Sequence, residues 1–256
     1  MKKILLIAIT VLILTGCSRE NSQEGIIATF DGYTITEKDI EKEIISRKIT
    51  DLMTKKLNDL NSMPEKNIRD FYLNSFNVEG KDLTEYQEQF IRYHERQFNY
   101  DITKNEAFNI VLRDKILYKT AIKKGYKKTS EKEALKMIRK ANETSEKFIG
   151  EDNDKLIEEF SAYEDEVVKD YGYESYDEYE KSRLDKLSEL ITINNMEKEF
   201  INEIRSNPEL TDEQKWIYPV TSWENYTEHL IKDENINIVN KNYSIEYYGG
   251  LWTGDF

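Results

Sequence analysis

Histidine and cysteine, the residue types typical of zinc sites and of thiol catalysis, are sparse in this 256-residue chain. It has two histidines, His94 and His229, and neither has a cysteine or a second histidine at the spacing that metal ligands need. The acidic segment EDNDKLIEEF lacks the central glycine and ligand spacing of an EF-hand loop. Because 50 residues are Asp or Glu, carboxylate pairs arise by chance, and none identifies a general acid and base. With no Gly-x-Ser-x-Gly sequence and no phosphate-binding loop, the sequence predicts no catalytic residue, no metal site and no cofactor.

The single cysteine, Cys17, lies at the end of an N-terminal segment of secretory type. Two lysines open this segment, an apolar run follows from residue 4 to residue 14, and two small residues precede the cysteine. The run is shorter than the roughly 20 apolar residues that cross a bilayer. The residues LTGC resemble the bacterial lipobox, which implies removal of residues 1–16 and attachment of acyl chains, such as palmitate, to Cys17. The alternative is an ordinary signal peptide that a chance cysteine follows.

The net charge restricts the partners of the mature chain. The whole sequence carries −13, and loss of residues 1–16 removes Lys2 and Lys3 and leaves about −15. Such an acidic chain argues against binding to nucleic acid or to anionic lipid. Attachment to the membrane is therefore expected through the acyl chains on Cys17. We expect a lipid-anchored protein on the extracytoplasmic face of the cell membrane, and the Lys-, Ile- and Asn-rich composition together with the lipobox fits a Gram-positive source.

A β-hairpin is predicted directly after a polar tether, residues 17–25. The segments Ile26–Phe30 and Tyr33–Ile35 are rich in β-prone residues. Asp31-Gly32 lies between them and is a strong signal for a two-residue hairpin turn.

Helical spacing of apolar residues predicts a mainly helical chain after this hairpin. Thr36 is the expected N-cap of the first helix, and two capping boxes, SEKE and SYDE, open later helices at Ser130 and Ser175. Pro219 is expected to end a short helix, because proline removes a backbone donor and clashes with the preceding turn. The predicted helices cover 37–60, IRDFYLNSF, 83–98, 107–124, a segment from Ser130, 153–171, 175–205, a short helical start in LTDEQKWIY, and 223–233 with Ser222 as its cap.

One short strand, INIVN, follows the last helix, and it needs a partner because an isolated strand edge is unstable. The early strands are the available partners. We therefore predict that Ile236–Val239 pairs with Ile26–Phe30 and brings the two ends of the chain together. The expected fold class is mainly α with a small β element that pairs N- and C-terminal strands, in one domain over residues 26–240. Residues 241–256 form an aromatic tail without a clear period.

Four stretches of the sequence resemble the N-terminal chaperone domain of the SurA and PrsA family. ATFDGYTITEKDIEKEI resembles its opening, where two strands joined by an Asn/Asp-Gly turn lead into a helix. AFNIVLRDKILYKTAIKKGYKKTSEKEALKMI and VKDYGYESYDEYEKSRLDKL resemble the next two blocks, and WENYTEHLIKDENINIV resembles the closing helix and strand. The four stretches occur in the family order. The resemblance implies a helical chaperone domain that binds unfolded or newly exported polypeptides.

Two features depart from the family pattern. Residues 61–104 are longer than expected between the first two blocks and are treated as an insertion. The parvulin prolyl-isomerase domain that usually follows the third block does not fit between Arg205 and Ser222. We therefore expect a chaperone without isomerase activity. A divergent prolyl isomerase and a scaffold lipoprotein with one dedicated partner are the alternatives, since a fold does not fix a function.

Aromatic residues are frequent for so polar a chain, with 17 tyrosines and 10 phenylalanines. Rigid rings bind apolar segments of other chains at a low cost in conformational entropy. Phe90, Tyr93, Tyr173 and Tyr176, which come from two aromatic-rich parts of the chain, are therefore candidate client-binding residues. The alternative is that these rings pack in the core.

Overall fold

The computed structural model describes residues 25–60, 67–76, 83–137, 139–140 and 154–248, so the predicted signal peptide, Cys17 and residues 249–256 lie outside it. The chain is mainly helical with one three-stranded antiparallel sheet, which confirms the expected fold class. Residues 131–137 are helical as well, and none of the helices within the described ranges is long and apolar enough to cross a membrane. The other elements are β1 (Ile26–Phe30), β2 (Tyr33–Thr36), α2 (Glu37–Leu60), α3 (Ile68–Phe76), α4 (Glu85–Gln97), α5 (Lys104–Lys123), α7 (Asp154–Lys169), α8 (Tyr176–Ser182), α9 (Leu184–Arg205), α10 (Asp212–Asp233) and β3 (Asn237–Ile238).

The predicted hairpin is present, and its turn follows from the two residues at its tip. Asp31 and Gly32 have φ angles of 41° and 81°, the left-handed values that a type I′ turn requires. Thr36 then caps α2. Its Oγ1 accepts a hydrogen bond from the Asp39 backbone N–H at 3.3 Å, and the Asp39 carboxylate accepts one from the Thr36 N–H at 2.8 Å. This reciprocal pair fixes the path of the chain from the sheet into α2.

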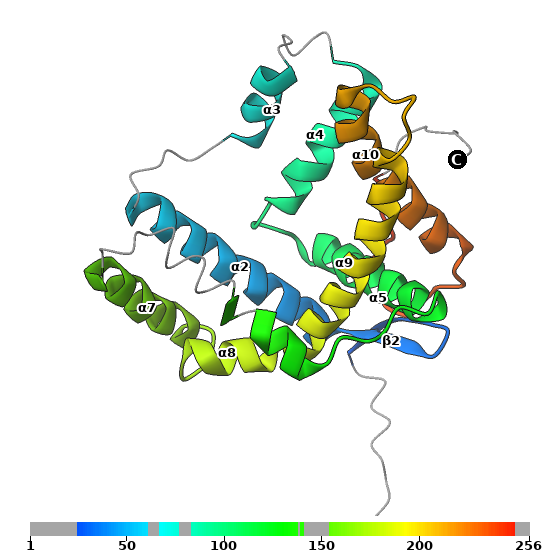
Figure 1. Cartoon of the computed structure of the whole chain (residues 1–256). Coiled ribbons are helices and arrows are strands. Elements are labelled where there is room, and N and C mark those ends of the chain that lie inside the picture. The colour runs from blue at the N-terminus through cyan, green and yellow to red at the C-terminus, as the bar shows by residue number, and fades with distance from the viewer. Residues whose placement is uncertain (1–24, 61–66, 77–82, 138, 141–153, 249–256) are drawn as a thin grey trace, which may run out of the picture.

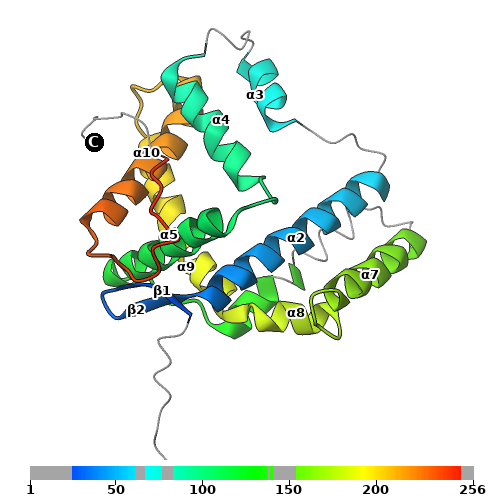
Figure 2. The ribbon, with the colours of Figure 1, turned by 180° about the vertical axis from the view of Figure 1, so that it is seen from behind.

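The closing strand pairs with the first strand, as predicted. β3 lies antiparallel to β1, with Ile238 opposite Ala28, so the strand order is β2-β1-β3. The Val239 N–H donates to the carbonyl oxygen of Ile27 at 2.8 Å. Figure 2 shows the sheet beside the start of α2 and one end of α5. The two ends of the described chain therefore stabilise each other.

A single helix, α10, replaces the two helices predicted around Pro219, so that prediction was wrong. Thr211 caps it through a capping box with Gln214, and the helix continues through Pro219. A proline leaves the carbonyl four residues earlier without its usual N–H partner. Here that carbonyl belongs to Lys215, and it accepts a hydrogen bond at 3.3 Å from Nε of Arg205 in α9. Ser222, the predicted cap, is buried inside α10 instead.

The single helix predicted over residues 175–205 is divided at Arg183. Ser175 caps α8 as expected, but α8 ends at Ser182 and α9 begins at Leu184. Arg183 is the junction, with φ −105° and ψ −2°. The sequence has no glycine or proline at this point, and therefore no local signal for the break.

Three apolar clusters hold the helices together. The first joins the sheet to α2, α5 and the end of α10, the second joins α2 to α7 and α8, and the third joins α5, α9 and α10. Figure 1 shows α2, α7 and α8 along one side of the molecule and α3, α4 and the start of α10 on the other. Helices α5 and α9 connect these two sides.

The described part of the aromatic tail is bound to α2 and α5. Tyr243 is buried, and its hydroxyl donates to Glu37 at 2.7 Å. The Asn109 side chain donates to the Ser244 carbonyl at 3.0 Å and accepts from the Glu246 N–H at 2.8 Å. Residues 243–248 therefore cover part of α5.

Candidate functional site

The middle of the molecule contains a cleft with two adjoining lobes. The first lobe, between α2, α5, α8 and α9, has a volume of about 270 Å³, and the second, between α2, α4, α5, α9 and α10, about 320 Å³. Each is close to the lower end of the roughly 300–1,000 Å³ range of ligand pockets. Five residues line both lobes and mark their boundary: Glu43, Ser46, Asp114, Arg183 and Lys186.

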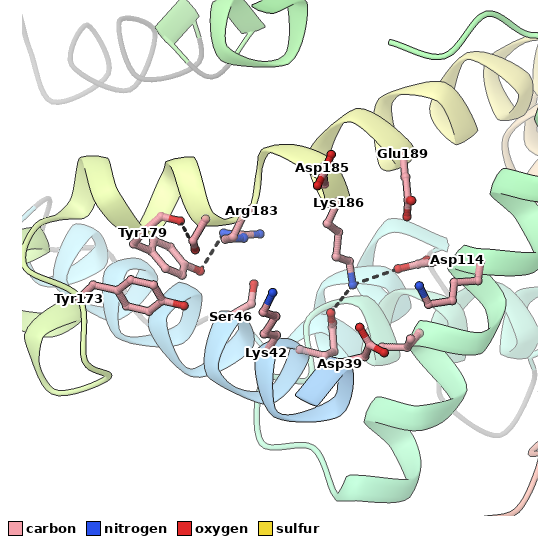
Figure 3. A pocket seen from close by; sticks show the side chains of 14 residues that line it. Asp39, Lys42, Ser46, Asp114, Tyr173, Tyr179, Arg183, Asp185, Lys186 and Glu189 are labelled. Atoms are coloured by element: carbon pink, nitrogen blue, oxygen red, sulfur yellow. Dashed lines mark hydrogen bonds and ion pairs between the residues drawn. The ribbon is translucent and has the colours of Figure 1, made fainter. Parts of the chain in front are cut away.

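An ion-pair cluster ties three helices together at this boundary (Figure 3). Lys186 of α9 forms ion pairs with Glu43 of α2 and with Asp114 of α5, the latter at 3.2 Å. Arg47 also pairs with Glu43, at 3.2 Å. Burial opposes ionisation of Glu43, but Lys186 and Arg47 together hold its pKa below the usual value. Burial is the stronger influence on Asp114 and raises its pKa.

A second charged cluster borders the second lobe, which Arg113 and Glu224 line. The Glu224 carboxylate, from α10, accepts hydrogen bonds from Arg96 of α4 and Arg113 of α5. The Nη1 of Arg113 is buried and has no hydrogen-bond partner among the described residues. Glu197 of α9 also lines this lobe, and burial together with repulsion from Glu224 raises the pKa of its carboxyl. Tyr248 stacks on this cluster from outside, with its ring 4.5 Å from the guanidinium carbon of Arg96.

Of the four predicted client-binding residues, the three tyrosines lie at or near the cleft. Tyr173 lines the first lobe, and Tyr93 lines the second, where burial raises the pKa of its hydroxyl. Tyr176 packs beside the first lobe against Tyr179, with ring centroids 5.8 Å apart. Burial raises the pKa of Tyr176 as well. The structure thus brings Tyr93 to the same cleft as the tyrosines of α8, although they are distant in the sequence.

Phe90 is a core residue, and the client-binding role predicted for it is corrected. Its side chain is 1 % exposed. It packs in an aromatic cluster with Tyr72 and Phe76 of α3 and with Trp216 of α10. The physical reason is its position on α4, because the side of this helix that carries Phe90 and Ile91 faces inward.

Neither histidine lines the cleft. Nδ1 of His94 is 2.8 Å from the Phe90 carbonyl oxygen, and burial lowers the pKa of its ring. His229 is exposed on α10. No group of three or more His, Cys, Asp or Glu side chains in the described ranges could hold a metal ion.

The charged residues of the cleft were missed at the sequence level, although α9 carries a pattern that points to them. Arg183, Lys186, Leu190, Ile193 and Glu197 recur at alternating spacings of three and four residues and line the second lobe. This spacing places them along one face of the helix. Three of these five positions are charged, whereas a core-facing stripe is usually apolar, so the sequence pattern resembles a solvated helix face.

Comparison with known proteins gives no relative. No family model, no curated protein and no solved structure matches the chain. The cleft is therefore the feature of the described chain that bears on function. Its lining mixes tyrosine rings, paired charges and a serine hydroxyl, which suits a ligand with both apolar side chains and polar backbone groups.

Proposed function

We propose that this chain is a lipid-anchored extracytoplasmic chaperone that holds unfolded segments of newly exported polypeptides, without prolyl isomerase activity. The observation that carries the proposal is the central cleft, which has Tyr173 at one lobe and Tyr93 at the other. The secretory leader with Cys17 and the four sequence stretches that resemble the SurA and PrsA chaperone domain support it.

An unfolded segment presents apolar side chains and unpaired backbone groups at the same time. Tyrosine rings offer rigid apolar area at a low entropic cost and keep a hydroxyl for a hydrogen bond. The charged and hydroxyl side chains between the rings supply donors and acceptors for the client's backbone. Since neither lobe is a deep apolar pocket, we expect weak and reversible binding, which a chaperone needs in order to release its client.

Suppression of aggregation tests this proposal directly. A chemically denatured, proline-poor client is diluted into buffer with and without residues 18–256, and light scattering is followed. Suppression at a near-stoichiometric ratio is the expected result. No suppression by a folded sample would refute holdase activity and would favour the scaffold alternative.

A pair of tyrosine variants locates the activity. Tyr173→Ala should weaken suppression severalfold, because it removes a ring from the first lobe. Tyr247→Ala is the matched control, since Tyr247 is 48 % exposed and lines neither lobe. Equal loss in both variants would place client binding outside the cleft.

Two further assays separate the alternatives. In a pull-down, many unfolded clients support a chaperone, whereas one stoichiometric folded partner supports a scaffold lipoprotein. Exchange of an X-Pro peptide bond should stay at its uncatalysed rate, tens to hundreds of seconds at 25 °C. Faster exchange would support the divergent isomerase instead.

A further inference from the structure

We infer that the cleft has a carboxylate-binding site at the junction of its two lobes, with Arg183 as the recognising side chain. This inference rests on the proposed function and specifies its client: a segment that carries an acidic group, either an Asp or Glu side chain or a free C-terminal carboxylate, beside apolar residues.

The first observation is that Arg183 keeps hydrogen-bonding capacity while its position is fixed. It lines both lobes. Its Nη1 donates to the Tyr179 hydroxyl at 2.8 Å, and its guanidinium carbon lies 5.0 Å from the centre of the Tyr179 ring. Tyr179 is itself 2 % exposed, so this support is rigid. Within the described part of the chain Arg183 forms no ion pair, unlike Arg47 or Arg113.

An arginine side chain that is fixed in position and has unused N–H donors can bind a carboxylate. A guanidinium has five N–H donors in a planar fork that matches the two oxygens of a carboxylate. One donor is used by Tyr179, and the others are available to a ligand. Because the side chain is already held by stacking and by a hydrogen bond, less rotamer entropy is lost when a ligand binds.

The second observation lies in the second lobe and is independent of the first. Nη1 of Arg113 is a buried donor without a partner among the described residues. Buried donors are nearly always satisfied, so an unsatisfied one calls for a ligand oxygen or a water. Arg113 of α5 and Arg183, at the junction of α8 and α9, line the same lobe. Two guanidinium groups with unused N–H donors line this lobe, and they favour the binding of an anionic ligand group over a cationic one.

None of the described carboxylates that line the second lobe forms an ion pair with Arg183. Four carboxylates line the second lobe. Glu43, Asp114 and Glu224 each form an ion pair with a cation, whereas Glu197 accepts no hydrogen bond from a described residue. Glu197 lies 14 residues from Arg183 along α9, about 21 Å at 1.5 Å per residue, so it does not occupy the same position. The net charge of the chain repels acidic ligands at long range, and a preference for one must therefore arise locally.

Peptide binding by the mature chain tests the inference. Three fluorescent, proline-free peptides of ten residues share the same aromatic and aliphatic residues. The first has a central Glu and blocked termini, the second has Gln at that position and blocked termini, and the third is the Gln peptide with a free C-terminal carboxylate. Dissociation constants are measured by anisotropy near 0.15 M salt, where the Debye length of about 8 Å screens the distant charges.

We expect the Glu peptide to bind the wild-type chain about tenfold more tightly than the blocked Gln peptide, the gain of one charge-assisted hydrogen-bonded pair. Arg183→Gln should remove this preference, so that the Glu peptide and the blocked Gln peptide bind with similar affinity, and measurable binding of the blocked Gln peptide shows that the cleft is intact. Arg139→Gln is the matched control, because it removes the same charge from an exposed position that lines neither lobe. The third peptide shows whether a chain terminus is also accepted.

Equal affinity of the wild-type chain for the Glu peptide and the blocked Gln peptide would overturn the carboxylate site and leave the chaperone proposal standing. A Glu preference that persists in Arg183→Gln would also overturn it. Failure of all three peptides to bind would refute both proposals. If Arg183→Gln does not fold, Arg183→Lys serves instead. It keeps the charge but loses the planar fork, and should lower the preference severalfold.

Discussion

The Lys186 ammonium lies 3.2 Å from the Asp114 carboxylate and joins α9 to α5 in the middle of the cleft. The same ammonium also binds Glu43 of α2, so one side chain connects three helices. Apolar clusters also join α2 to α5 and α5 to α9, so both ion pairs and apolar packing hold the helices around the cleft.

Removal of Lys186 should destabilise the fold. Lys186→Met leaves Asp114 without its ion-pair partner and leaves Glu43 paired with Arg47 alone. Loss of one partner of a buried pair costs about 3–5 kcal/mol, and we expect the lower end, about 3 kcal/mol, because the Lys186 side chain is 35 % exposed. The loss in the free energy of unfolding is measured by urea denaturation at pH 7.

Lys181→Met is the control for Lys186→Met. It breaks the exposed pair with Asp177 and should cost under about 0.5 kcal/mol. The cost of Lys186→Met should shrink below about pH 4, where carboxyls take up protons. Similar costs for both variants at pH 7 would show that the ion-pair cluster does not hold the helices together.

Glu197 should make stability depend on pH in a defined direction. Burial and the Glu224 charge raise its folded-state pKa above the unfolded value of 4.5. A raised folded pKa means that the folded state binds the proton more tightly. The contribution of Glu197 to the free energy of unfolding is therefore fully present below pH 4.5, and it is lost as pH rises through the folded-state pKa.

The glutamine side chain in Glu197→Gln is uncharged at every pH, so this variant does not lose stability as pH rises past the Glu197 pKa. We expect its urea midpoint to exceed that of the wild type at pH 7 and to match it by about pH 4. The raised pKa of Asp114 acts in both proteins and cancels in the comparison. Glu203→Gln, at an exposed position of the same helix, is the control. A midpoint difference that is constant from pH 4 to 7 would contradict the prediction.

The continuity of α10 should depend on Arg205. Its Nε supplies the Lys215 carbonyl with the hydrogen bond that Pro219 cannot supply. Arg205→Met should cost about 0.5–1.5 kcal/mol in the wild type, the net value of a typical hydrogen bond. Pro219→Ala restores a backbone N–H that reaches the same carbonyl, and Arg205→Met should then cost little. A double-mutant cycle measures the coupling, and a value near zero would show that the bond is incidental.

The sequence was sufficient where local chemistry decided the structure. Asp31-Gly32 dictated the hairpin turn, and Thr36, Ser130 and Ser175 dictated helix starts. The partner of the last strand followed from a physical requirement, since its backbone groups needed β1. These features depend on a few neighbouring residues or on one unsatisfied edge.

The sequence was insufficient where residues distant in the chain compensate one another. Pro219 signals a helix end on its own, and only the contact with Arg205 shows otherwise. Lys186 and Glu43 are 143 residues apart, and in a chain with 50 acidic residues each resembles an ordinary solvated side chain. The client-binding residues were chosen by type, so Phe90 was included although its helix turns it into the core.

Asn109 should hold the C-terminal segment on α5. Its side chain is 1 % exposed and makes three hydrogen bonds, two of them to backbone groups of Ser244 and Glu246. Asn109→Ala leaves both groups without their partner and should cost about 1–3 kcal/mol. Because the lost bonds are local, amide exchange at Glu246 should accelerate more than exchange in α5. Asn202→Ala, at an exposed position of α9, is the control. Unchanged exchange at Glu246 would mean that the buried ring of Tyr243 and its bond to Glu37 suffice to hold the segment.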